Sequence, residues 1–196
     1  MGLESKRNKN ATNVSGKLVD GSNDALKCLN NPKRKMNGKI LAIDPGNEES
    51  AFVVWDGHRI LEKGKWSNQE LLDNLPRIVQ NINRGNVYIE MVASYGMAVG
   101  KTVFETCVWI GRYEESIVSL GCEVKKVYRK DVKMHICQSM RAKDSNIRQA
   151  IIDRFGKPGT KSNPNLVYQD REVKMAKDIW AAFAVALTAT EGDKIG

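Results

Sequence analysis

The chain has 196 residues, of which 41% are hydrophobic, and a formal net charge of +8 at pH 7. The length is typical of one domain, and the hydrophobic content excludes a wholly disordered chain. The positive charge favours a polyanionic partner, with nucleic acid ahead of an anionic membrane surface, although a basic protein without such a partner fits the charge equally well.

Residues 1–37 differ in composition from the rest of the chain. They are rich in Asn, Ser, Gly and Lys, show no sustained hydrophobic periodicity, and end in a basic cluster at 33–35. We predict a disordered basic tail over 1–37 and one folded domain over 38–196. The basic cluster could contact phosphates, or the tail could serve only to keep the protein soluble.

Three short strands are predicted at 40–44, 51–56 and 59–66. Each is rich in β-prone residues and the connections are tight, which is typical of an antiparallel meander. Asp44 closes the first strand, and Pro45 and Gly46 turn the chain directly after it. This pattern places a carboxylate at the end of a core strand.

A helix and a fourth strand follow the meander. Ser67, with Glu70 three residues later, predicts the N-terminus of a helix, and Pro76 is expected to break or kink that helix into two pieces. A strand over 87–92 is apolar around a single acid, Glu90, and a glycine-containing loop over 93–100 follows it. A long helix over 102–120 then leads to a fifth strand at 122–128.

The C-terminal part of the chain is predicted to be mostly helical. The stretch 129–141 is basic and partly helical, a helix over 144–155 follows, and 157–173 is typical of a loop. The last helix, 175–190, is almost wholly apolar after Asp178 and must therefore be largely buried. This order of elements predicts an α/β fold with a mixed five-stranded sheet flanked by helices.

The cysteines and the hydropathy of the chain indicate the cellular compartment in which it works. The four cysteines are widely separated, and with only two histidines in the chain a Cys/His zinc site is not expected. We expect free thiols in a reducing compartment. No apolar run is long enough to span a membrane and the N-terminus has no apolar signal core, so we expect no membrane partner and a cytoplasmic location.

Three acids are embedded in apolar surroundings: Asp44, Glu90 and Asp178. Burying an unpaired carboxylate is costly, and no Lys or Arg within these strands can pair with Asp44 or Glu90. Carboxylates clustered around Mg²⁺ resolve that cost, and two such ions are a known device for phosphodiester hydrolysis, one activating water and the other stabilising the leaving oxygen. Taken singly, each acid has another explanation: a turn cap for Asp44, a solvent-facing strand end for Glu90, and a helix dipole for Asp178.

Four passages of the chain, in this order, carry a family resemblance: ILAIDPGNEESAFVVWDG, VYIEMVASYGMAVGKTVFETCVWIGRYEE, KDVKMHICQSMRAKDSNIRQAIIDRFG and KDIWAAFAVALTA. They resemble the RuvC family of Holliday-junction resolvases, the phage-type members above all, within the RNase H-like superfamily. The resemblance covers about 39–190. It implies an RNase H-like fold, a homodimer with one active site per subunit, and Mg²⁺- or Mn²⁺-dependent paired nicking of branched DNA, in the host-cell cytoplasm if the chain is phage-encoded.

The resemblance also assigns residues. Asp44 and Glu90 match the family's acids on the first and fourth strands, and Asp178 matches one of two acidic or histidine positions on the last helix. These three are the predicted catalytic and metal-binding residues. The other position on the helix falls on Ala181 or on Met175, depending on the alignment, so one ligand expected of the family is missing.

Two further surfaces are predicted from the same passages. Lys133 and Lys143 are the preferred phosphate contacts, with Arg129 and Lys130 beside them in a basic stretch. Tyr95 lies in a loop that either connects the sheet to a helix or stacks as a wedge at the branch point. A second basic candidate is the loop with lysines at 157 and 161, and three apolar residues of the long helix belong either to the core or to a dimer seam: Phe104, Val108 and Trp109.

Two functions from different classes follow. The first is a dimeric, structure-selective endodeoxyribonuclease that resolves four-way or other branched DNA by two-metal-ion hydrolysis. The second, favoured by the missing ligand, is a catalytically weak or inactive RNase H-like module that binds branched DNA as a scaffold. An actin-like phosphotransferase also carries a strand-Asp-Pro-Gly turn, but it needs two such domains and this chain has the length of one.

Overall fold

The computed structural model describes residues 38–83, 85–94, 96, 98–155, 175 and 177–192. The chain divides into two units, Met1–Lys35 and Met36–Gly196, and all the described residues belong to the second unit. The basic tail predicted for 1–37 and the loop predicted for 157–173 lie outside the described residues, and so does Tyr95.

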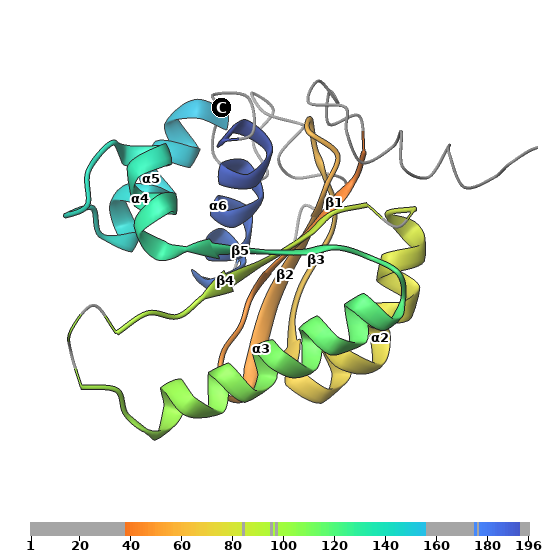
Figure 1. Ribbon diagram of the computed structural model, residues 1–196. Coiled ribbons are helices and arrows are strands. Elements are labelled where there is room, and N and C mark those ends of the chain that lie inside the picture. Colours follow the sequence, from red (N-terminus) through yellow and green to blue (C-terminus); the bar gives the residue numbers. More distant parts are fainter. Residues whose placement is uncertain are drawn as a thin grey trace, which may run out of the picture. The chain divides into compact units, whose positions relative to one another are not determined.

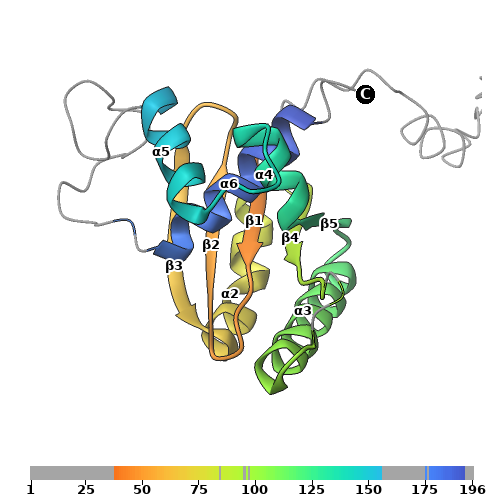
Figure 2. The same cartoon turned by 90° about the vertical axis from the view of Figure 1, so that its left-hand side faces the viewer.

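Five strands form one mixed sheet: β1 (Ile40–Asp44), β2 (Glu49–Trp55), β3 (Ile60–Ser67), β4 (Val87–Met91) and β5 (Val124–Tyr128). Their order across the sheet is β3-β2-β1-β4-β5, as Figure 2 shows from the side of α6. The first three strands are antiparallel neighbours, whereas β4 runs parallel to both β1 and β5. The predicted mixed five-stranded sheet is confirmed, with strand ends shifted by no more than two residues.

Helices cover both faces of the sheet (Figure 1). On one face lie α2 (Asn68–Asn81) and α3 (Lys101–Ser119), and on the other lie α4 (Arg129–Cys137), α5 (Asp144–Phe155) and α6 (Lys177–Gly192). Each face has its own apolar core, and the nearly continuous apolar sequence of α6 is buried from Ile179 to Ala189, apart from the half-buried Ala181. The expectation of a largely buried last helix is confirmed.

Strand periodicity determines which face each side chain reaches. Along β1, Ile40 and Ala42 join the core beneath α6, whereas Leu41 and Ile43 join the core beneath α2 and α3. Because side chains alternate with a period of two, the next residue, Asp44, emerges on the α6 face. The same count along β4, from Tyr88 on the α6 face, brings Glu90 out on that face as well.

The helix that follows the meander differs from the prediction. Ser67 is its N-cap, with a side chain that accepts a hydrogen bond of 3.2 Å from the Glu70 amide. The expected division at Pro76 is wrong, because α2 is one helix through that residue. Pro76 lies on the exposed side of α2, while Leu71, Leu75, Ile78 and Val79 anchor the opposite side in the core. This packing keeps the helix continuous although Pro76 has no N–H to donate.

The expectations of free thiols and of no membrane-spanning segment concern residues that the structure describes in part. Cys107 and Cys137 are free thiols. Of the helices that the structure describes, none has both the length and the apolar content to cross a bilayer.

Candidate active site

Asp44 and Glu90 meet at the carboxyl ends of two parallel neighbouring strands. The β1–β4 register pairs Ile43 with Ile89, so the next residues on each strand, Asp44 and Glu90, lie side by side on the α6 face. Their carboxyl groups are within hydrogen-bonding contact, and Glu90 is only 8% exposed. The sequence-based pairing of these two acids is therefore present in the structure.

The acid pair is poorly solvated. Burial raises the pKa of Asp44 well above its ordinary value, and the negative charge of Glu90 raises it further. Burial also raises the pKa of Glu90, although the Arg129 guanidinium opposes this shift. Two carboxylates whose charged forms are disfavoured in this way form a site that a cation would stabilise.

Arg129 supplies a positive charge that the sequence analysis did not foresee at this position. It follows β5 directly and opens α4, and its Nη1 lies 3.3 and 3.2 Å from the two carboxylate oxygens of Glu90. Its Nη2 lies 2.5 Å from Asp144 Oδ1 at the start of α5. The strands themselves contain no Lys or Arg that could pair with Glu90, and the partner that does pair with it lies 39 positions away in the chain.

Asp178 is near the pair but turned to another partner. It lies in the first turn of α6, and its carboxylate oxygen lies 3.0 Å from Lys65 Nζ on β3. The same ammonium lies 2.7 Å from Glu49 at the start of β2. Across the described part of the chain, no three Asp, Glu, His or Cys side chains gather closely enough to hold a metal ion.

Three pockets open around Asp44. One, of about 310 Å³, is lined by Asp44, Arg129, Asp144 and Asp178 together with residues of α5 and α6. A second, of about 360 Å³, joins Asp44 and Glu90 to the chain after β4. A third, of about 300 Å³, joins Asp44 and Asp178 to Glu49 and Lys65. Asp44 is thus the residue that these three spaces share, and Asp178 faces two of them.

The donor set fits a divalent cation in part. Asp44 and Glu90 offer adjacent carboxylate oxygens, the ligand type that Mg²⁺ and Mn²⁺ prefer. Asp178 lines two of the three pockets that Asp44 lines, while it is paired with Lys65. Of the two positions considered for the missing ligand, Ala181 lines a pocket and Met175 packs against the apolar core. Neither side chain has an oxygen that could bind a metal ion.

Asp144 is the acid that sequence reasoning passed over. It was interpreted only as the beginning of a helix, yet it lines the same pocket as Asp44 and Asp178 and binds Arg129. Its charge also contributes to the raised pKa of Glu90, after burial. Its place directly after Lys143, in a passage already assigned to the site, was the signal available in the sequence.

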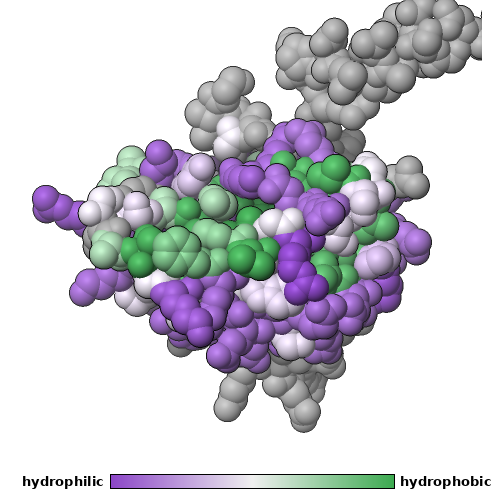
Figure 3. All heavy atoms as spheres, turned by 60° about the horizontal axis from the view of Figure 1, so that its bottom comes forward, coloured by the Kyte–Doolittle hydropathy of each residue, from purple (hydrophilic) through white to green (hydrophobic). Residues whose placement is uncertain are grey.

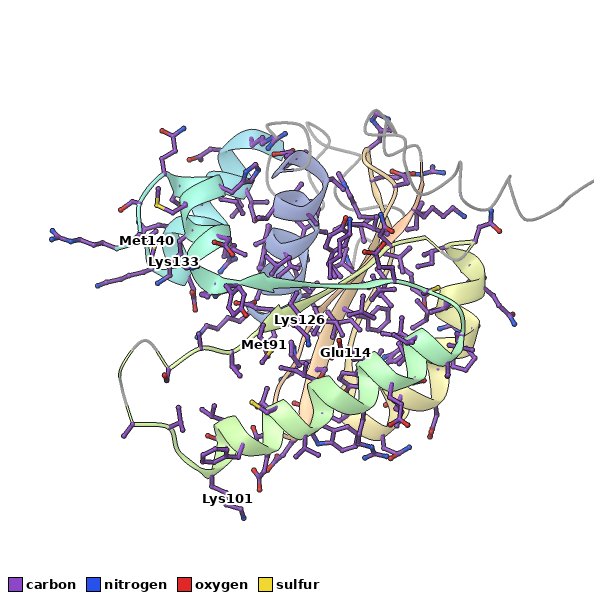
Figure 4. All side chains as sticks on the ribbon, viewed as in Figure 1. Met91, Lys101, Glu114, Lys126, Lys133 and Met140 are labelled. Atoms are coloured by element: carbon purple, nitrogen blue, oxygen red, sulfur yellow. The ribbon has the colours of Figure 1, made fainter. Side chains whose placement is uncertain are left out.

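The predicted DNA contacts fall in three different environments. Lys143 and Lys130 are exposed, Lys133 is half-buried on α4, and the Lys130 ammonium lies 5.8 Å from the centre of the Tyr128 ring. Arg129 is bound to two carboxylates, as described above. Figure 4 shows Lys133 on the α4 side of the sheet, apart from Lys126, which pairs with Glu114 of α3 at 2.9 Å.

Known protein-family models give no match to this sequence, and neither do curated proteins. Solved structures do share its fold. RuvC of Thermus thermophilus is 14% identical with a TM-score of 0.61, over 81% of this chain and 96% of that chain. T. thermophilus RuvC in complex with a Holliday junction substrate is 13% identical with a TM-score of 0.60, over 80% and 97%. Fowlpox virus resolvase in complex with Holliday junction DNA is 12% identical with a TM-score of 0.52, over 78% and 99%.

Proposed function

Because the chain has the RuvC-like RNase H fold, we propose that it is a metal-dependent endodeoxyribonuclease that nicks Holliday junctions or other branched DNA. The observation that carries the proposal is the pair of adjacent carboxylates, half-buried Asp44 and buried Glu90, at the ends of adjacent parallel strands.

The residues divide the work as follows. Asp44 and Glu90 offer the first oxygen ligands, and Asp178 adds a third when its side chain leaves Lys65. Two divalent ions, Mg²⁺ or Mn²⁺, would supply there the Lewis-acid charge and the activation of water that phosphodiester hydrolysis requires. Arg129 holds Glu90 through both oxygens, and the low solvent exposure of Glu90 strengthens these interactions.

The DNA backbone is held, in this proposal, by the basic residues around the same edge of the sheet. Lys143 adjoins Asp144 in the sequence, and Lys130 and Lys133 lie on α4, which begins at Arg129. The helices α4, α5 and α6 also begin at this edge, and the N-terminal ends of helices favour phosphate oxygens. Tyr95 keeps its proposed role as a stacking residue at the branch point.

A second copy of the chain is the proposed partner of α3. Phe104 and Val108, one turn apart, are 61% and 62% exposed, and Val118 further along is 56% exposed. Figure 3 shows apolar side chains forming a green band across this face, bordered by hydrophilic ones. Paired nicking of a four-way junction needs two active sites, and an isologous contact through this helix would supply the second.

The test is cleavage of a synthetic four-way junction beside a linear duplex of the same sequence, with Mg²⁺, with Mn²⁺ and with EDTA. We expect wild-type protein to nick the junction only with metal, and Asp44→Asn and Glu90→Gln to lose at least about a hundredfold in rate. Asp73→Asn, on the exposed side of α2, is the control and should keep wild-type activity. Full Mg²⁺-dependent activity in either active-site variant would show that the metal assignment is wrong.

The scaffold function has one observation in its favour, since Asp178 is paired with Lys65 and the three acids do not converge. It predicts tight junction binding without cleavage under any metal condition. The same assay distinguishes the two functions, because a binding titration with the uncleaved junction accompanies it.

A further inference from the structure

A buried polar network lies beneath the turn that carries Asp44. Its side chains are Ser50 of β2, Asn68 of α2 and Tyr113 of α3, which are 1%, 2% and 0% exposed. Ser50 Oγ donates to Asn68 Oδ1 over 2.6 Å. The Tyr113 hydroxyl lies 3.1 Å from Ser50 Oγ, 3.1 Å from Asn68 Oδ1 and 3.2 Å from the Asn68 carbonyl, and its single proton goes to one of the three.

Both main-chain groups of Gly46 end in this network. Its N–H donates to Ser50 Oγ over 3.3 Å, and its carbonyl accepts from Asn68 Nδ2 over 3.0 Å. The main-chain N–H of Asn68 also donates to the Glu48 carbonyl over 2.9 Å, further along the same turn. The segment from Gly46 to Glu48 is therefore held from below by three elements that are distant in the chain.

The turn has little freedom of its own. A Cβ on Gly46 would lie 2.3 Å from the Glu49 carbonyl oxygen, so the backbone there is too tightly folded for any side chain. Pro45 restricts the preceding residue, Asp44, to extended backbone geometry. A displacement of Gly46 would therefore also move Asp44, two residues before it.

The network lies on the opposite face of the sheet from the acids. Asp44 and Glu90 emerge on the α6 face, whereas Phe52 and Val54, which share the face of Ser50, pack with α2 and α3. Burial raises the pKa of Tyr113 to about 12, so its hydroxyl stays a neutral donor at any working pH. Buried polar groups are costly unless they are fully paired, and an apolar trio would fill this space more simply.

From these contacts we propose that Tyr113, Asn68 and Ser50 are positioning residues for Asp44. They hold the turn after β1 in the position where the Asp44 carboxylate adjoins Glu90. Because Tyr113 belongs to α3, the geometry of the acid pair then depends on how α3 packs against the sheet. The proposal rests on the proposed function in so far as Asp44 is a metal ligand, but the positioning itself can be measured without any nuclease activity.

The first measurement is amide hydrogen exchange of the full chain by NMR, without metal or DNA. Tyr113→Phe removes only the hydroxyl, and Ser50→Ala removes the acceptor of the Gly46 amide. We expect Gly46 to exchange about tenfold faster in both variants, while amides in the middle of β1 keep their wild-type rates. Ile117→Val, a buried change on the same helix without a polar group, is the control and should leave Gly46 unchanged.

The second measurement is the Mg²⁺ dependence of junction nicking. With Asp44 less well placed, the Mg²⁺ concentration for half-maximal rate should rise about three- to tenfold in Tyr113→Phe, while junction affinity and the rate at saturating Mg²⁺ stay within about twofold of wild type. A purely structural role would lower the rate at every Mg²⁺ concentration without moving the midpoint. Gly46→Ala, which displaces the turn directly, should shift the midpoint in the same direction.

The proposal is overturned if Gly46 exchange is unchanged in both Tyr113→Phe and Ser50→Ala, or if Ile117→Val accelerates it equally. It is also overturned if exchange accelerates while the Mg²⁺ midpoint stays at the wild-type value. If wild-type protein cuts no DNA at all, the proposed function fails, and the exchange data still decide whether these residues hold the turn. In that case Ca²⁺ titration of the metal-free protein replaces the nicking midpoint.

Discussion

The Asp44 side chain has little contact with solvent, and it is affected by the carboxylates of two other acids, Glu90 and Asp178. Burial and the charge of Glu90 together raise its pKa, and Arg129 only partly offsets them. A carboxyl group whose pKa is higher in the folded state than in the unfolded state stabilises the fold at low pH. This contribution is lost as the pH rises through the folded-state pKa. At neutral pH without metal, Asp44 is therefore a destabilising residue.

We predict that Asp44→Asn raises the Tm of the metal-free protein by about 2–4 °C near neutral pH, the shift that roughly 1 kcal/mol produces in a domain of this size. The gain should shrink as the pH falls towards the ordinary carboxyl value of 3.8, where wild-type Asp44 is protonated as well. Calorimetry in EDTA across that pH range is the measurement. Asp73→Asn should change Tm by less than about 1 °C, and an equal gain in that variant would contradict the prediction.

Among the helices, α4, α5 and α6 are tied together by one acid. Glu191, in the last turn of α6, lies 3.0 Å from His135 Nε2 on α4 and accepts from both Nη atoms of Arg154 on α5, at 2.7 and 2.5 Å. Burial acts to raise the pKa of Glu191, but these hydrogen bonds outweigh it and leave the pKa lowered. A lowered carboxyl pKa gives stability above the unfolded-state pKa, and this stability is lost in acid.

Glu191→Gln should lower the free energy of unfolding by about 1 kcal/mol near neutral pH, because it keeps the shape and removes the charge that pairs with Arg154. The deficit should shrink as the pH falls below the ordinary glutamate value of 4.5, and it should disappear once the pH has fallen through the lowered pKa at which folded Glu191 loses its charge. Urea denaturation at several pH values measures both effects. Glu123→Gln, an exposed glutamate just before β5, provides the baseline, and a deficit that persisted undiminished in acid would speak against the ion pair.

For the whole molecule, the arrangement of layers concentrates function at one edge of the sheet. The carboxyl ends of β1 and β4 carry the acid pair, β5 leads into Arg129, and α5 and α6 begin beside the same pocket. The apolar stripe of α3 lies on the other side of the sheet, so the proposed DNA and partner surfaces do not compete for the same residues.

Phe104→Glu should convert a dimer into a monomer, because it places a charge within the exposed apolar stripe where the second copy is proposed to pack. Light scattering after size exclusion would give the mass. Met140→Glu makes the same change at another exposed apolar side chain, 51% exposed, and should leave the mass unchanged. A wild-type protein that is already monomeric at micromolar concentration would exclude this dimer.

Lys133→Ala and Lys143→Ala should each weaken junction binding and reduce the slope of log K against log salt concentration by about 0.7–0.9, the effect of losing one phosphate contact. Fluorescence anisotropy with a labelled junction, in Ca²⁺ to prevent cleavage, measures both quantities. Lys39→Ala, whose ammonium binds the Asn81 carbonyl at the far end of β1, is the matched control. If the slope stayed the same in both test variants, the phosphate contacts would have to lie elsewhere.

The sequence alone determined much of the local structure and the acid pair. Strand periodicity around Asp44 and Glu90, the Pro-Gly turn, the Ser67 cap and the apolar run after Asp178 are short-range patterns, and each reappears in the structure. Alternation along β1 and β4 places both acids on one face, and their register is set by the same apolar residues. Local pattern was misleading at Pro76, since packing of the apolar side of α2 outweighs one missing hydrogen bond.

Only the tertiary structure decided what surrounds those acids. Arg129 reaches Glu90 over 39 positions, Tyr113 reaches Ser50 over 63, and Lys65 diverts Asp178 from a different strand. None of these partners can be identified from residue spacing in the sequence. A long polar side chain can reach many neighbours, and the pair that forms is determined by burial and distance in the folded state. Periodicity could therefore predict where the acids lie, whereas their counter-charges and their support depended on contacts between elements distant in the chain.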